Sequence, residues 1–255
     1  MRIKSRLGRL ALSLCLGAVP AGIGLGQTGG IVSAYACTTN TMYYYAPTQA
    51  HETGGADGVS ATFSVNTLTP YVCDETRSHT LESAVLYLPL SSDYIEIGED
   101  RGIISNSSGS QQCVCPNGLW YFNFTSTPSV GTSYLYASGF MVAGTAHTHQ
   151  AQEITKCDPG CHLVAHYVTD ATTWPEQPLP AGDNPGFYVG TQGEVYGDRT
   201  NSMGNATISN YQYHAGTWKP WDSPTVYAAN APYCNYLNSV NPFVTENLGP
   251  SSGGC

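Results

Sequence analysis

Basic residues are scarce in this chain. Its 255 residues hold nine Lys and Arg against eighteen Asp and Glu, and four of the nine lie at the very start, as Arg2, Lys4, Arg6 and Arg9. Residues 37–255 therefore carry five basic residues and a net charge of about −13. Repulsion between like charges then excludes nucleic acids and anionic membranes as expected partners.

Long apolar runs are also rare, and the one at the start is typical of a secretory signal. The basic residues precede Leu10–Leu25, which Pro20 and several glycines interrupt and which is too short for a good membrane span. We predict a signal peptide over residues 1–36, with cleavage near Gly26 or after Ala36, and a secreted, extracellular mature protein. No later stretch is apolar and long enough to cross a bilayer.

A helical period is absent after the signal, because Gly, Pro, Ser and Thr interrupt every long window. Short alternating segments take its place, and Val59–Asn66 is the clearest, with apolar residues on one face only. Asp170–Gly186 contains four prolines and predicts a long loop. The pattern favours an all-β fold, an antiparallel, jelly-roll-like sandwich of two packed sheets, as a single domain over residues 37–255. The further predicted strands are Ala84–Leu88, Tyr94–Gly98, Leu119–Thr125, Tyr134–Val142, Cys161–Thr169, Gly186–Tyr196 and Thr207–Tyr213.

Eight cysteines remain after the signal, an even number that predicts up to four disulfides in a secreted protein. The sequence does not select a pairing among them. Cys157, Cys161, His162 and His166 have a spacing similar to that of zinc ligands, but two histidines four residues apart on a strand are separated by about 13 Å. We therefore expect disulfides and surface histidines here, with no metal and no cofactor.

Two common catalytic signatures are missing, namely the Gly-x-Ser-x-Gly motif of serine hydrolases and the glycine-rich phosphate-binding loops. Two carboxylates inside apolar strands remain, Glu96 and Glu194. Strand alternation places Tyr94 beside Glu96, and Tyr188 and Gln192 beside Glu194, on the faces opposite their apolar neighbours. These three residues are the candidate substrate-binding neighbours.

Paired carboxylates can hydrolyse a peptide or glycosidic bond without a metal. When two such groups lie close together their pKa values separate, so that one is ionised while the other keeps its proton. The ionised group can take a proton from water, and the protonated group can donate to a carbonyl oxygen. The alternative is that Glu96 and Glu194 are two solvated strand acids that never meet.

The two glutamates lie in motifs that resemble those of the neprosin family. Ile95-Glu96-Ile97-Gly98 is similar to the family's first glutamate motif, and Gln192-Gly193-Glu194-Val195, followed by Thr200–Asn205 with its Met-Gly pair, is similar to the second. The segments Ala61–Val65 and Ser78–Leu88 resemble the strands that precede the first motif. In order, the resemblance covers residues 58–213.

The resemblance implies a secreted glutamic peptidase that cleaves next to proline, a β-sandwich fold, and Glu96 and Glu194 as the catalytic pair on a concave face. It does not say which glutamate activates the water and which stabilises the oxyanion. The chain departs from the family in carrying Glu99 where a Trp is usual, and in lacking a Gly-Tyr-x-Pro segment before the second motif.

Two functions therefore follow from the sequence. The first is an acid-active endopeptidase whose partner is a peptide or protein substrate. The second is a non-catalytic secreted β-sandwich that binds carbohydrate or protein, to which the eighteen tyrosines would contribute contact surface. The sequence leaves the oligomeric state undetermined.

Overall fold

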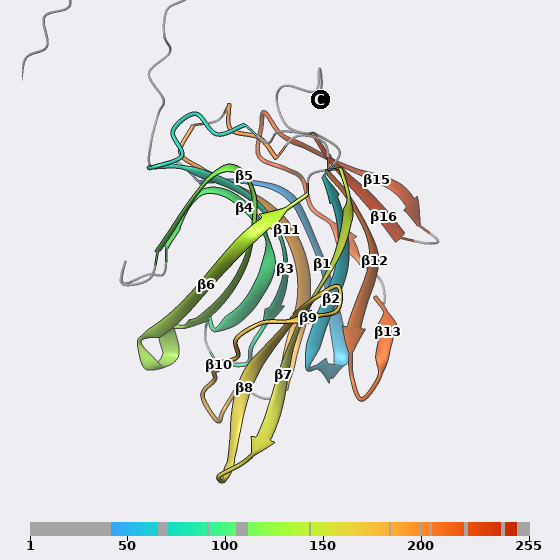
Figure 1. The fold of residues 1–255 in the computed structure, drawn as a ribbon. Helices are drawn as coiled ribbons and strands as arrows, with labels where there is room; N and C mark the ends of the chain where they lie inside the picture. The colour runs from blue at the N-terminus through green and yellow to red at the C-terminus, as the bar shows by residue number, and fades with distance from the viewer. Residues whose placement is uncertain are drawn as a thin grey trace, which may run out of the picture. The chain divides into compact units, whose positions relative to one another are not determined.

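The computed structural model describes residues 42–65, 71–90, 92–105, 112–142, 144–183, 185–198, 200–203, 206–221, 224–240 and 243–248. The predicted signal peptide and its cleavage point lie outside these residues. The described part of the chain is built from strands, with one short 3₁₀ turn, η1 (Pro128–Val130), between two of them (Figure 1). No helix among the described residues has the length and apolar character to cross a membrane.

The first sheet carries both glutamates and is antiparallel throughout. Its strand order is β14-β1-β11-β3-β4-β5-β6. Since β3 lies between β4 and β11, the two glutamate strands are next-but-one neighbours although 98 residues separate their glutamates in the chain. The bounds are β1 Met42–Ala56, β3 His79–Tyr87, β4 Tyr94–Ser105, β5 Gln112–Thr127, β6 Thr132–Met141, β11 Gly186–Tyr196 and β14 Thr225–Val226.

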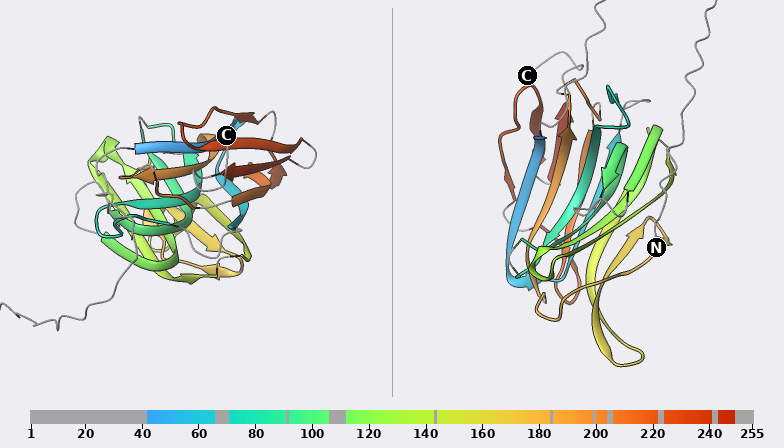
Figure 2. Two further views of the ribbon diagram at one scale, coloured as in Figure 1. Left: turned by 90° about the horizontal axis from the view of Figure 1, so that it is seen from above. Right: turned by 90° about the vertical axis from the view of Figure 1, so that its left-hand side faces the viewer.

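The second sheet is also antiparallel, with the order β10-β8-β7-β2-β12-β16-β15, and with β9 beside β8 and β13 beside β12. Figure 2 shows the two sheets as stacked layers. The bounds are β2 Gly58–Val65, β7 Ala146–Cys157, β8 Cys161–Thr169, β9 Thr172–Thr173, β10 Gln177–Pro178, β12 Ala206–His214, β13 Trp218–Pro220, β15 Cys234–Val240 and β16 Phe243–Leu248.

The core between the sheets comes from the alternate apolar residues that the sequence pattern singled out. Val59, Ala61 and Phe63 of β2 are fully buried and pack in one cluster with Ile95 and Ile97 of β4. Burial of this alternating set removes apolar surface from water and fixes which face of each strand turns inward. The fold is therefore the predicted all-β antiparallel sandwich.

The observed strands differ from the predicted ones mainly in length. Strand β4 continues to Ser105, through Glu99, Asp100 and Arg101, whereas the sequence predicted a strand that ends at Gly98. Gly139 forms the predicted bulge, with a φ of +62° at the shift in register between β5 and β6. The described residues of the predicted loop Asp170–Gly186 are irregular apart from the two-residue strands β9 and β10 and from Gly186, where β11 begins.

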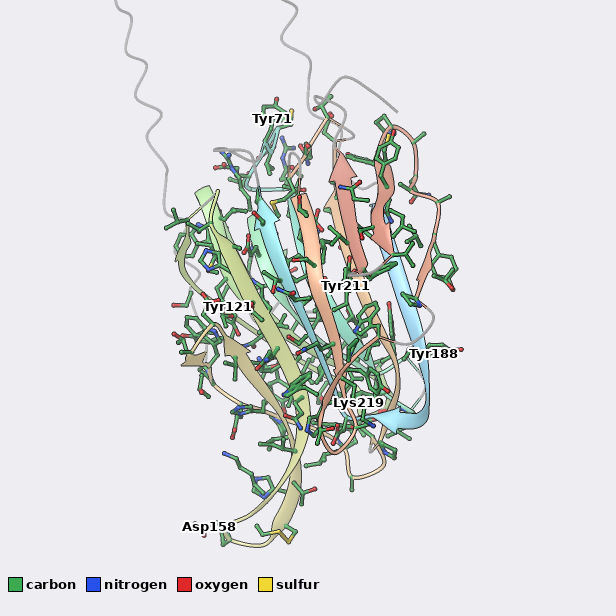
Figure 3. The ribbon with its side chains drawn as sticks, turned by 90° about the vertical axis from the view of Figure 1, so that its right-hand side faces the viewer. Tyr71, Tyr121, Asp158, Tyr188, Tyr211 and Lys219 are labelled. Carbon is green, nitrogen blue, oxygen red and sulfur yellow. A yellow bond between two sulfur atoms is a disulfide. The ribbon has the colours of Figure 1, made fainter. Side chains whose placement is uncertain are left out.

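Disulfides occur in the predicted manner. Cys113 is bonded to Cys115 in β5, and Cys157 to Cys161 across the end of the β7–β8 hairpin. Cys73 and Cys234 are also disulfide-bonded. The β7–β8 hairpin extends beyond the rest of the sandwich, with Asp158 at its tip (Figure 3).

Candidate active site

The candidate site lies on the face of β11, β3 and β4 that is turned away from the second sheet. Ile95, Ile97 and Val189 occupy the core face, so Glu96 and Glu194, which alternate with them, project from the opposite face. The two sequence-predicted glutamates thus share one surface of one sheet. Glu96 is 6% exposed, and the side chain of Glu194 is 15% exposed.

The register of the three strands arranges this surface in rows. Gly190, Val85 and Glu96 are directly opposite one another, and two residues further along the strands lies the row of Gln192, Ser83 and Gly98. The next rows are Glu194, Leu81 and Asp100, and then Tyr196, His79 and Gly102. The two glutamates therefore lie on either side of a row that consists of an amide, a hydroxyl and a glycine.

Gly98 in that middle row reflects a very close approach of two backbones. A Cβ atom at this position would lie 2.0 Å from the carbonyl oxygen of Glu82 on β3. No larger residue fits without a shift of β3 or β4, and this explains in physical terms why a glycine follows the first glutamate.

Glu96 is held by two donors that converge on one of its oxygens. The Ser83 hydroxyl donates to Oε1 at 2.5 Å, and the Gln192 amide donates to the same atom at 3.1 Å. Burial, followed by the negative charge of Glu194, raises the pKa of Glu96 to about 7, although both hydrogen bonds act in the opposite direction. Because Oε1 already accepts two hydrogen bonds, a proton on Glu96 belongs on Oε2.

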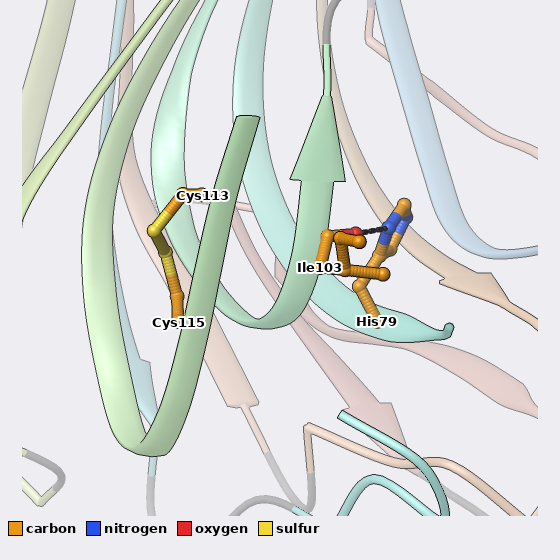
Figure 4. The surroundings of a disulfide bond; sticks show 4 residues. All are labelled: His79, Ile103, Cys113 and Cys115. Carbon is orange, nitrogen blue, oxygen red and sulfur yellow. Dashed lines mark hydrogen bonds between the residues drawn. A yellow bond between two sulfur atoms is a disulfide. The ribbon is translucent and has the colours of Figure 1, made fainter. Parts of the chain in front are cut away.

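Glu194 has a histidine as its partner. His79 Nε2 lies 3.1 Å from Glu194 Oε1, and His79 Nδ1 lies 2.8 Å from the carbonyl oxygen of Ile103 (Figure 4). Burial lowers the pKa of His79, but the hydrogen bond to Glu194 and the charges of Asp100 and Glu194 outweigh this effect and raise it to about 9.

Asp100 is a third carboxyl group on the same face. It is fully buried, and neither of its carboxyl oxygens has a hydrogen-bond partner. Burial raises its pKa to about 7; the charge of His79 lowers the pKa and that of Glu194 raises it. An unpaired buried carboxyl of this kind is costly, and such groups concentrate at functional sites.

The three predicted substrate-binding residues lie in the two rows on either side of Glu96. Gln192 contacts Glu96 directly. Tyr94 and Tyr188 lie in the row next to Glu96, on either side of Tyr87, and the rings of Tyr87 and Tyr94 are 6.5 Å apart. Tyr188 is 36% exposed, so this row presents aromatic surface beside Glu96.

Glu99, the residue at the position where the neprosin motif usually has Trp, lies on the opposite face of β4. Its Oε1 is 3.3 Å from His149 Nε2 on β7, in the space between the two sheets. The Thr169 hydroxyl lies 2.9 Å from the other nitrogen of His149. A buried Glu–His contact therefore replaces apolar packing directly behind the candidate site.

Three residues of the site were not identified from the sequence, namely His79, Ser83 and Asp100. Once the register is known, all three are seen to lie on the same face of the sheet as the two glutamates. The sequence did place Asp100 at an even spacing from Glu96, and His79 at an even spacing from Ser83, so that each pair shares a face of its strand. It did not show that β3 lies between β4 and β11, and only that order brings these residues together.

The fold is similar to that of a glutamic peptidase of known structure. Scytalido-glutamic peptidase, bound to a peptide-based transition state analog, covers 84% of this chain and 100% of its own at a TM-score of 0.52, with 7% of residues identical. SCP-B, a member of the eqolisin family of peptidases in complex with the tripeptide Ala-Ile-His, covers the same shares at a TM-score of 0.49 and 8% identity. No family model matches the chain, and no curated protein matches its sequence. At such low identity the likeness to Scytalido-glutamic peptidase establishes a shared fold.

Proposed function

We propose that the chain is a secreted, acid-active glutamic endopeptidase in which Glu194 and Glu96 activate water for hydrolysis of a peptide bond. The single observation that carries the proposal is the placement of both carboxyls on one sheet face with unequal surroundings. The fold shared with Scytalido-glutamic peptidase supports a peptide as the substrate. Cleavage next to proline, membership of the neprosin family and secretion are parts of this proposal that the sequence motifs support.

The unequal surroundings assign the two roles. Glu194, bonded to a histidine that favours the ionised carboxylate, takes a proton from the water whose oxygen attacks the scissile carbonyl carbon. Glu96, whose pKa is about 7, keeps its proton in acid and donates from Oε2 to the carbonyl oxygen. The tetrahedral intermediate then breaks its C–N bond as Glu194 passes its proton to the leaving nitrogen, and Glu96 recovers its own.

Glutamine substitutions test the two roles separately. In Glu194→Gln no base remains, so cleavage of a proline-rich peptide should fall by about 10²–10⁴-fold. Glu96→Gln places an amide N–H where Oε2 stood and keeps a donor for the carbonyl oxygen, so its loss should be smaller. A glutamine cannot ionise, and the decline in kcat/KM near pH 7 should therefore disappear in this variant.

The measurement is a series of peptide digests between pH 3 and pH 8, with folding of each variant checked by circular dichroism. Glu176→Gln is the matched control, since this glutamate pairs with Lys156 and His166 on the second sheet. Cleavage that survives Glu194→Gln unchanged would exclude Glu194 as the base. Folded wild-type protein that cleaves no peptide in this range would favour the second function, a binding protein.

A further inference from the structure

The region around Glu194 contains a charge arrangement that the two-carboxylate mechanism does not itself require. We propose that His79 is a positioning residue, a fixed imidazolium cation that holds Glu194 in its ionised form and so leaves the shared proton of the pair on Glu96. This inference rests on the proposed function, and it concerns which of the two glutamates is ionised and which is protonated.

The hydrogen bonds of His79 determine where its protons lie. The carbonyl oxygen of Ile103 can only accept, so His79 Nδ1 must carry a hydrogen and donate it at 2.8 Å (Figure 4). The Nε2 atom, 3.1 Å from Glu194, then shares one proton with that carboxyl. Either the imidazolium faces a carboxylate, or a neutral imidazole faces a protonated acid.

The neighbouring charges select the first of these two states. His79 is packed between β11, which contributes Glu194 and the ring of Tyr196 at 5.8 Å, and β4, which contributes Asp100 and, further along, Glu96. Among the described residues, two carboxyls, those of Glu194 and Asp100, face the imidazole closely, and no other cation acts on it. The charges of Asp100 and Glu194 both favour the cation, in agreement with a His79 pKa of about 9.

Asp100 strengthens this arrangement from the far side of β3. It lies diagonally across from His79 on the adjacent strand, within the range over which cross-strand side chains interact. With no hydrogen-bond partner for either oxygen, its charge has few other compensating groups. The imidazolium thus lies next to two acids, Glu194 and Asp100, while Glu96 lies three rows away from it.

Two substitutions separate the charge of His79 from its hydrogen bonds. Gln at position 79 can place its amide nitrogen near the position of Nε2, which keeps a neutral donor to Glu194. Asn can place its nitrogen near Nδ1, which keeps the contact with Ile103 alone. Neither carries a positive charge, so both should remove the cation beside the proposed base and move the acid side of the kcat/KM profile upward by about one pH unit or more.

The control is His166→Gln, which removes a histidine bonded at 2.8 Å to Glu176 on the second sheet and should leave the profile unchanged. A fall in kcat with little change in KM should accompany the shift in the position 79 variants. If His79→Gln and His79→Asn are folded and keep the wild-type profile, the positioning role is wrong even though the endopeptidase assignment stands.

A second measurement does not depend on activity. The ¹⁵N chemical shifts of the imidazole nitrogens should show His79 protonated on both atoms from pH 5 to pH 8, and neutral above pH 7 in Glu194→Gln. A neutral ring in the wild-type protein over that range would overturn the inference whether or not the protein cleaves peptides. A doubly protonated His79 in a protein that cleaves no peptide would keep the charge arrangement and reject the proposed function.

Discussion

The Ser83 hydroxyl and the Gln192 amide meet at a single oxygen of Glu96, while burial of the carboxyl has the larger effect on its pKa. Both donors stabilise the ionised form, so they act against the burial that raises the pKa of Glu96. They also leave Oε2 as the oxygen that can carry a proton toward a substrate.

Removal of one donor gives a testable change in pH dependence. In Ser83→Ala the pKa of Glu96 should rise, because a hydrogen bond that lowers it is lost. Glu96 then keeps its proton to higher pH, and the alkaline side of the kcat/KM profile should move upward by up to about one pH unit. The measurement is the profile of peptide cleavage between pH 5 and pH 9; a shift in the acidic direction would contradict the assignment of Glu96 as the proton-bearing member.

At the residue scale the sequence indicated which face of its strand each residue takes, but not which residues of other strands lie beside it. The alternation around Glu96 and Glu194 indicated which face each residue takes, because that depends on one strand alone. His79, Ser83 and Asp100 become recognisable only when β3 is known to lie between β4 and β11. Strand order is set by the packing of the whole sheet, and no local pattern encodes it.

Strand β4 has carboxyl groups on both of its faces. Glu96 and Asp100 lie on the outer face, and Glu99 lies between the sheets with His149 of β7. Glu82 of β3 is directly opposite Glu99 and is equally buried. The strand therefore connects the candidate site to a polar cluster in the core, at a position where an apolar residue would be the ordinary choice.

The Glu99–His149 pair should be important for stability. In His149→Leu the buried carboxyl group of Glu99 loses a hydrogen-bond partner, which typically costs about 1–3 kcal/mol. Glu99→Gln combined with His149→Leu should recover part of that loss, since a buried amide costs less to leave unpaired than a carboxyl group. Urea unfolding of the wild type, the two single variants and the double variant completes the cycle. Additive effects of the two changes would show that the two side chains do not interact.

The strands that the sequence identified have apolar alternation or a continuous apolar run, and the long strands β1 and β7, which it did not predict, have neither. Strand β1 pairs with β11 over most of its length, but its sequence is polar, with three consecutive tyrosines, and indicated no face. The end of β4 was missed for a related reason, because consecutive charged residues are typical of an exposed loop. Both segments are strands because of their partners in the sheet.

Across the whole molecule, several buried carboxyls have pKa values above their ordinary range. Burial is the main cause for Glu96 and Asp100, at about 7, for Glu153, at about 8, and for Asp183, at about 6. Each of these groups binds a proton more tightly in the folded chain than in the unfolded chain. Folding is therefore most favoured at low pH, where both states hold these protons, and it loses free energy as the pH rises and the unfolded chain ionises first.

The sign of the effect predicts a protein that is more stable in acid. Between about pH 4, the ordinary pKa of a carboxyl, and pH 8, stability should fall as pH rises, by up to about 1.4 kcal/mol per pH unit for each such group. His79 acts in the same direction as its raised pKa is approached. The midpoint of thermal unfolding should decline from pH 4.5 to pH 8, with a shallower decline in Asp100→Asn. A midpoint that rises over this range would contradict these pKa values.

The hairpin that extends from the sandwich has a consequence for a protein that would share its surroundings with peptidases. The turn at Asp158 is bracketed by the Cys157–Cys161 disulfide, and the residues around it are exposed. A backbone cut between these two cysteines leaves β7 and β8 covalently joined through sulfur as well as paired in the sheet. This exposed projection is thus a place where a single nick releases no fragment.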